Sequence, residues 1–191
     1  MNRREALRQL GIMAGGLMII PSCDLSRENV LLAYEKLQIT EEHRQLLAKV
    51  VETILPGGEI TGARELNIQD YVLVMANDCL AAENQRRFVA GLKQFGGFVQ
   101  QKYGSSFEEM SQTKAEEVYM AAVSQQEENP KGKEFNLDEI KYFLDLSKRY
   151  TLEGYLSSEY FMTEIMPYEM IPGGFQGEVL IEPQQKLNIN G

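Results

Sequence analysis

The side chains that most often carry enzyme chemistry are scarce in this chain. It has one histidine, His43, and two cysteines, Cys23 and Cys79, among its 191 residues. A histidine-activated nucleophile could use only His43, which follows two glutamates in what the pattern predicts to be the first turn of a helix. A di-iron bundle needs a Glu-x-x-His motif on two helices, so one histidine excludes its usual form. We interpret His43 as a solvated surface residue and predict no catalytic and no metal-binding residues.

The cysteines and the glycine-rich segment match no cofactor motif. The two cysteines lack the C-x-x-C spacing of zinc, thiol-exchange and covalent haem sites. The run Gly-Gly-Phe-Gln-Gly at residues 173–177 follows no predicted βαβ unit, which a dinucleotide-binding loop requires. Cys79 lies on the apolar stripe of a predicted helix, so we expect a buried free thiol, and a cross-link to another polypeptide is the alternative.

The charge balance limits the classes of partner. The formal net charge is -9. Residues 1–22 hold three Arg and one Glu, a net of +2, so the remainder carries -9 minus +2, or -11. An acidic chain of this kind is not expected to bind nucleic acid, which requires a basic surface. Electrostatic attraction to an anionic membrane is not expected either.

The first 23 residues have the composition of an export signal. A basic start that includes Arg3 and Arg4 is followed by an uncharged apolar stretch at residues 10–20 and by Ile-Pro-Ser-Cys ending at Cys23. The stretch is shorter than the roughly 20 apolar residues that a membrane-spanning helix needs. Arg3 and Arg4 resemble a twin-arginine signal, and the last four residues resemble a lipobox. We expect residues 1–22 to be removed, and a lipid on Cys23 to hold the mature protein in the periplasm or cell envelope. A buried N-terminal helix is the alternative.

The remainder of the chain predicts an all-α fold. We expect a tether over residues 23–39, and a single compact helical domain over residues 40–191 with about five helices and an irregular C-terminal arm. Apolar side chains recur at spacings of three and four residues within these helices. Thr40, Ser111 and Asn136 have the side chains of N-caps. The other two helices are expected to begin near residues 68 and 84.

Glycine and proline predict the interruptions in this helical pattern. Gly96 and Gly97 lie within the third predicted helix, where they predict either a kink or a close contact with a neighbouring helix. After Glu159 the chain is rich in Pro and Gly, which favours irregular structure over helix.

Residues 151–179 form the most distinctive segment of the chain. The segment combines five aromatic residues with short polar side chains and with Pro and Gly at its turns. Such a segment can cover the protein's own helices, or it can present a rigid aromatic surface to a partner, where Tyr and Phe are favoured. The residue pattern alone does not distinguish these two roles.

Three places in the sequence resemble the gluconate 2-dehydrogenase subunit 3 family, the small subunits of exported flavin-dependent sugar and polyol dehydrogenases. One is Thr-Leu-Glu-Gly-Tyr-Leu-Ser-Ser-Glu-Tyr at residues 151–160, followed by Tyr168 and by Ile-Pro-Gly at residues 171–173. Another is Glu-Thr-Ile-Leu-Pro at residues 52–56, followed by Gly-Ala and by Met75, Asp78 and Cys79. The third is the twin-arginine-like leader. The resemblance spans nearly the whole chain.

The resemblance implies a non-catalytic subunit that escorts, exports and stabilises a large FAD-dependent subunit of the glucose-methanol-choline type. FAD is then expected in the partner and no cofactor in this chain, with a cytochrome as a candidate electron acceptor. Family members often carry a cysteine in the last motif, where this chain has Glu178. The expected partner interface comprises Tyr155, Ser157, Ser158, Glu159, Tyr160, Tyr168, Pro172, Gly173 and Phe175.

Two other functions stay open at the level of sequence. A stand-alone envelope lipoprotein would bind a small molecule or another envelope protein through the aromatic arm. A free-standing enzyme would show activity as the purified chain alone.

Overall fold

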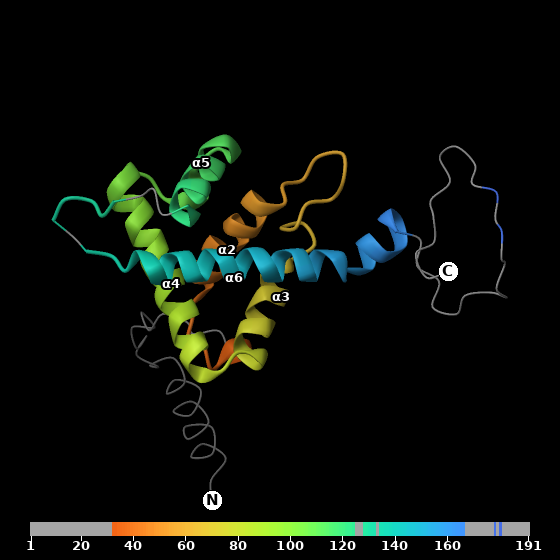
Figure 1. Ribbon diagram of the computed structural model, residues 1–191, viewed down its shortest axis with the longest axis horizontal. Helices are drawn as coiled ribbons and strands as arrows, with labels where there is room; N and C mark the ends of the chain where they lie inside the picture. Colours follow the sequence, from red (N-terminus) through yellow and green to blue (C-terminus); the bar gives the residue numbers. More distant parts are fainter. Residues whose placement is uncertain (1–31, 125–127, 133, 167–177, 179, 181–191) are drawn as a thin grey trace, which may run out of the picture. The chain divides into compact units, whose positions relative to one another are not determined.

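The computed structural model of the protein describes residues 32–124, 128–132, 134–166, 178 and 180. All regular structure within these residues is helical, which confirms the predicted all-α class (Figure 1). The elements in chain order are η1 (Leu32–Tyr34), α2 (Glu41–Ile54), α3 (Ile68–Val74), η2 (Met75–Cys79), α4 (Ala82–Tyr103), η3 (Phe107–Glu109), α5 (Gln112–Val123), α6 (Leu137–Leu156) and η4 (Phe161–Ile165).

Local side-chain hydrogen bonds mark where three helices begin, and at two of them the predicted cap side chain, Ser111 or Asn136, accepts the bond. The side chain of Ser111 accepts a hydrogen bond from the backbone N–H of Lys114 at the start of α5. Asn136 does the same for Glu139 at the start of α6. At the start of α2, the N–H of Thr40 donates to Nδ1 of His43 at 3.2 Å. Each bond satisfies a polar group that a helix end leaves without a partner.

Helix α6 lies at the centre of the fold and packs against α2, α3, α4 and α5 (Figure 1). Its most extensive contact is with α4. At this contact the ring of Phe143 lies 5.3 Å from that of Phe88 and 6.0 Å from that of Phe95, centroid to centroid. A Cβ atom at Gly91 would overlap the carbonyl oxygen of Glu139. The two helices can therefore approach this closely only because position 91 has no side chain.

Helix α4 runs unbroken through Gly96 and Gly97, so these residues do not kink it. A Cβ atom at Gly96 would lie 3.2 Å from Leu46, and one at Gly97 would lie 3.4 Å from Phe135. Of the two predicted roles, the structure supports close contact with neighbouring segments.

The hydrophobic core begins before the boundary that the sequence predicts. Tyr34, Leu37 and Ile39 are 8%, 2% and 0% exposed and belong to the core cluster, although they lie in the predicted tether. Leu37 and Ile39 lie in a turn and in irregular backbone, where buried side chains do not recur every 3.6 residues. The helical pattern that located the other core residues is therefore absent here.

Within the described part of the chain, no helix has the length and hydrophobicity needed to cross a bilayer. Arg3, Arg4 and Cys23, on which the predictions of export and lipidation depend, lie outside the described residues.

Candidate functional site

Two segments that are far apart in sequence meet at the C-terminal end of α6. The Oη of Tyr155 donates a hydrogen bond to the carbonyl oxygen of Thr61 at 2.8 Å. The N–H of Thr61 donates to the Oη of Tyr160 at 3.1 Å. We call these three residues the tyrosine clamp. It joins two of the three places that carry the family resemblance, because Thr61 immediately precedes the Gly-Ala pair and both tyrosines belong to residues 151–160.

The loop between α2 and α3 is closed on itself and presents Thr61 to the tyrosines. The N–H of Ala63 donates to the carbonyl oxygen of Leu55 at 3.0 Å. A Cβ atom at Gly62 would lie only 2.8 Å from the Cα of Gly57. The two sides of the loop can therefore touch here only because position 62 has no side chain. The loop ends at Asn67, whose φ of 54° places it in the left-handed region that Asn tolerates better than most residues. This turn leads the chain directly into α3.

Two serines hold the chain in position between the tyrosines. The Oγ of Ser158 donates to the carbonyl oxygen of Tyr155 at 2.7 Å and accepts from the N–H of Phe161 at 3.2 Å. The Oγ of Ser157 donates to the carbonyl oxygen of Glu153 at 2.7 Å. Both hydroxyls thus satisfy backbone groups at the end of α6 and guide the chain into η4.

The exposure of the predicted interface residues is uneven. Tyr155 is 5% exposed, so its ring packs inside the protein, 6.5 Å from the ring of Tyr160 and 5.8 Å from that of Phe161. Burial raises the pKa of Tyr155, which keeps its hydroxyl protonated and able to donate. Tyr160 is half-buried, and Ser157 and Glu159 are exposed. Tyr168, Pro172, Gly173 and Phe175 lie outside the described residues.

Apolar side chains next to the clamp reach the solvent. Ile60, which precedes Thr61, is 48% exposed, and Leu156, which follows Tyr155, is 51% exposed. A cavity of about 440 Å³ opens beside Tyr160, lined by Leu66, Ser158, Glu159, Tyr160, Thr163 and Glu164. We call the exposed surface of Ile60, Leu156 and this cavity the α6-end surface. It brings exposed aliphatic groups, one half-buried aromatic ring and polar side chains to the same end of α6, a combination that protein-binding surfaces also contain.

The described residues contain no group of three or more His, Cys, Asp or Glu side chains placed to hold a metal ion. His43, which we interpreted as a solvated surface residue, is instead half-buried. The Oγ1 of Thr40 lies 2.7 Å from its Nδ1, and the backbone N–H of Thr40 donates to the same nitrogen. The ring was expected on the surface because its neighbours Glu41 and Glu42 are exposed, but its capping contacts turn it back toward the helix start.

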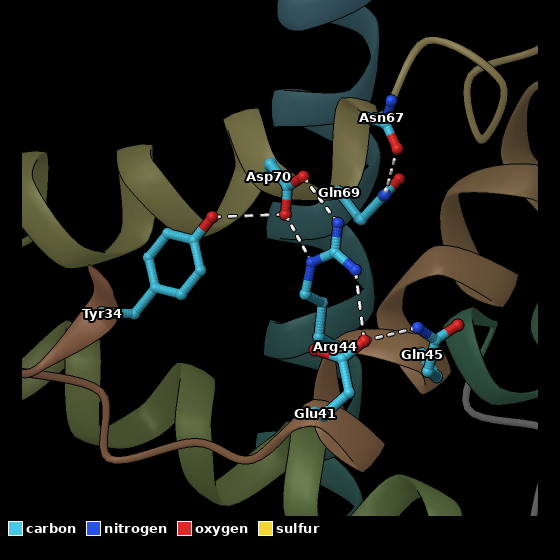
Figure 2. Close-up of polar contacts among 7 residues, drawn as sticks. All are labelled: Tyr34, Glu41, Arg44, Gln45, Asn67, Gln69 and Asp70. Atoms are coloured by element: carbon cyan, nitrogen blue, oxygen red, sulfur yellow. Dashed lines mark hydrogen bonds and ion pairs between the residues drawn. The ribbon is translucent and has the colours of Figure 1, made fainter. Parts of the chain in front are cut away.

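An ion-pair cluster that sequence reasoning missed joins η1, α2 and α3 (Figure 2). The Nε and Nη2 of Arg44 donate to the two carboxylate oxygens of Asp70, at 2.6 and 2.7 Å. Tyr34 donates its hydroxyl to the same carboxylate at 3.2 Å, and the Nη1 of Arg44 reaches Glu41 at 3.2 Å. The side chain of Gln69, beside Asp70, donates to Asn67 at 3.2 Å (Figure 2). Paired guanidinium–carboxylate bonds of this kind fix the relative orientation of two elements.

The pKa values of this cluster follow from its contacts. The hydrogen bonds from Arg44 lower the pKa of the Asp70 carboxyl, and the Asp70 carboxylate in turn raises the pKa of Arg44. Burial, together with the nearby Asp70 charge, raises the pKa of Tyr34 to about 12. All three groups keep their usual charge states at neutral pH, so the ion pair between α2 and α3 is maintained there.

Cys79 is exposed, which contradicts the expectation that it is buried. The prediction assumed that the α-helical period continues from Val72 to Cys79. The structure instead has a π-helix over Met75–Cys79, in which each turn takes more residues, so the apolar face rotates. Ala76 and Asn77 point inward in its place. The Sγ of Cys79 lies 3.8 Å from the Sδ of Met75.

Comparison with known proteins identifies a family. A family model described as gluconate 2-dehydrogenase subunit 3 matches residues 41–173. That span takes in α2–α6 and all three residues of the tyrosine clamp. No curated protein and no solved structure matches the sequence.

Proposed function

The chain belongs to the gluconate 2-dehydrogenase subunit 3 family, and on that basis we propose that it escorts, exports and stabilises a large FAD-dependent dehydrogenase subunit. We propose a partner of the glucose-methanol-choline type that oxidises a sugar or polyol. FAD and the reacting groups lie in that partner, and this chain supplies a binding surface and an export signal.

The observation that carries the proposal is the family match together with the α6-end surface. The match covers residues 41–173, and within it the clamp fixes the loop at Thr61 against the end of α6. Ile60 and Leu156 are thereby held with about half of their side-chain surface exposed. Because the clamp fixes the backbone beside these side chains before binding, less conformational entropy is lost when a complex forms. The proposed interface uses this surface and continues into the predicted aromatic arm.

The proposed route of export follows from the need to fold around FAD. A polypeptide that binds its cofactor before export needs a pathway that moves folded proteins, and the twin-arginine pathway does so. Arg3 and Arg4 on the small subunit would then serve both polypeptides. A lipid on Cys23 would hold the complex at a membrane of the cell envelope, where a cytochrome could accept the electrons.

Co-expression tests the proposal. The large subunit is produced with the full chain, with an Arg3→Lys, Arg4→Lys variant, with a Cys23→Ser variant, or alone, and its dehydrogenase activity is measured in the membrane, soluble periplasmic and cytoplasmic fractions. We expect activity outside the cytoplasm only when Arg3 and Arg4 are both present, bound to the membrane with the unaltered chain and released into the soluble periplasmic fraction with the Cys23→Ser variant. A large subunit that is exported, stable and fully active alone would contradict the proposal. A chain that stays monomeric beside it would favour the stand-alone lipoprotein.

A further inference from the structure

A groove with a basic rim lies between the first turns of α4 and the residues that follow η1. It is a cavity of about 440 Å³ whose lining includes Lys36, Leu37, Arg86, Val89, Ala90 and Lys93. The lining contains three cationic side chains and no carboxylate among the described residues. This local charge is opposite in sign to the net charge of -9 carried by the whole chain.

The cations of the groove are largely unneutralised. Lys36 lies 3.4 Å from Asp78 at an exposed position, and exposed pairs of this kind have weak net interaction energies. Within the part of the chain that the structure describes, Arg86 and Lys93 make no ion pair, and both are exposed. The positive charge of the groove therefore comes from these side chains, because Glu83 in the first turn of α4 offsets the partial positive charge of that helix end.

The spacing of the cations identifies the shape of the occupant. Arg86 and Lys93 lie seven residues apart on α4, which corresponds to about 10 Å along the helix axis. A single small anion is too short to contact both. Between them Val89 and Ala90 are half-buried, so the floor of the groove is apolar. The groove therefore suits an elongated ligand with at least two negative charges and an apolar face between them.

We propose that this groove docks an acidic, amphipathic polypeptide segment of the large dehydrogenase subunit. Carboxylates two turns apart on a helix lie on one face and have the required separation of about 10 Å. Nucleic acid fits poorly because the chain as a whole is acidic. The groove would be a second contact with the partner, separate from the α6-end surface, and the inference rests on the proposed function.

Charge reversal tests the inference in the full chain. Arg86→Glu with Lys93→Glu is compared with Lys131→Glu and Lys148→Glu, two exposed lysines outside the groove. Both double variants change the net charge equally. Affinity for the purified large subunit is measured by calorimetry from low to high NaCl. We expect the groove variant to bind about tenfold more weakly and to lose most of its salt dependence, and the control to stay within about twofold of the unaltered chain. Circular dichroism and Tm establish that each variant is folded.

The outcomes separate this inference from the proposed function. If the unaltered chain binds the large subunit and both variants bind equally well, the groove inference is wrong and the proposed function stands. If the unaltered chain does not bind the large subunit, both fail. Phosphatidylglycerol vesicles provide the second probe. Vesicle binding that the groove variant loses, with unchanged affinity for the large subunit, would assign the groove to an anionic membrane and overturn the inference.

Discussion

Replacing Gly91 by Ala tests whether the contact between α4 and α6 is as close as the structure describes. The new Cβ atom would overlap the carbonyl oxygen of Glu139 and lie 2.5 Å from the Cβ of Phe143. Neither neighbour is the flexible end of a side chain, so the two helices must move apart. That movement loosens the ring contact between Phe88 and Phe143. The substitution tests the packing of the fold itself, because the contact is in its core.

The magnitude follows from two opposing effects. Alanine gains about 1 kcal/mol over glycine within a helix, and overpacking a core costs about 1–3 kcal/mol. Because the overlap is with backbone, we take the upper end of the cost and expect a net destabilisation of about 2 kcal/mol. At about 2–4 °C per kcal/mol for a domain of this size, the Tm falls by about 4–8 °C.

Gly97→Ala is the matched control in the same helix. Its Cβ atom would lie 3.4 Å from the ring of Phe135, an ordinary contact distance. Only the gain in helix propensity remains, so we expect stabilisation of up to about 1 kcal/mol. Urea unfolding followed by circular dichroism measures both variants. A Gly91→Ala protein as stable as the unaltered chain would refute the described packing of α4 on α6.

Three further predictions concern the polar groups of the fold. Tyr155→Phe leaves the carbonyl of Thr61 without its donor and should lower the free energy of unfolding by about 1–2 kcal/mol; a loss below the error of urea titration would contradict the clamp. Arg44 lowers the pKa of Asp70 in the folded state. The contribution of this pair to the free energy of unfolding is therefore fully present above the pKa of Asp70 in the unfolded chain, about 4, and is lost as the pH falls through the lower pKa of the folded state. Asp70→Asn should therefore flatten the fall of Tm below about pH 4, and an unchanged acid profile would argue against the pair. Exposed Cys79 should react with a thiol reagent in folded Cys23→Ser protein about as fast as in urea, whereas strong protection would mean that it is buried.

The sequence predicted the features that depend on local contacts. The caps at Ser111 and Asn136 are interactions between residues three apart, and the composition of those few residues determines them. The all-α class and the apolar helix faces follow from periodicity in the same way. These parts of the fold could be inferred because no distant residue changes them.

The features that sequence reasoning missed depend on distant residues or on a change of helix type. Arg44 and Asp70 are 26 residues apart, and neither residue alone indicates the other. Tyr155 stood out by its segment, but its hydrogen bond to Thr61 spans 94 residues. Cys79 was placed on the wrong face because the π-helix after Val74 breaks the 3.6-residue period.

The tyrosine clamp gives a physical reason why two separate segments carry the family resemblance. The loop that contains Thr61 needs Gly62 for its closure and the hydroxyls of Tyr155 and Tyr160 to hold its backbone. Together the two segments fix the surface through which we propose that the large subunit binds.

Light scattering on the purified, co-expressed pair measures whether this chain associates with a flavin-dependent dehydrogenase subunit. We expect one flavin-containing complex that holds both polypeptides. Leu156→Glu on the α6-end surface should weaken it by at least about tenfold, whereas Met120→Glu, at the 60% exposed Met120 on α5, should not. A monomeric chain beside a stable, active, flavin-loaded large subunit would show that the two polypeptides do not form the proposed complex.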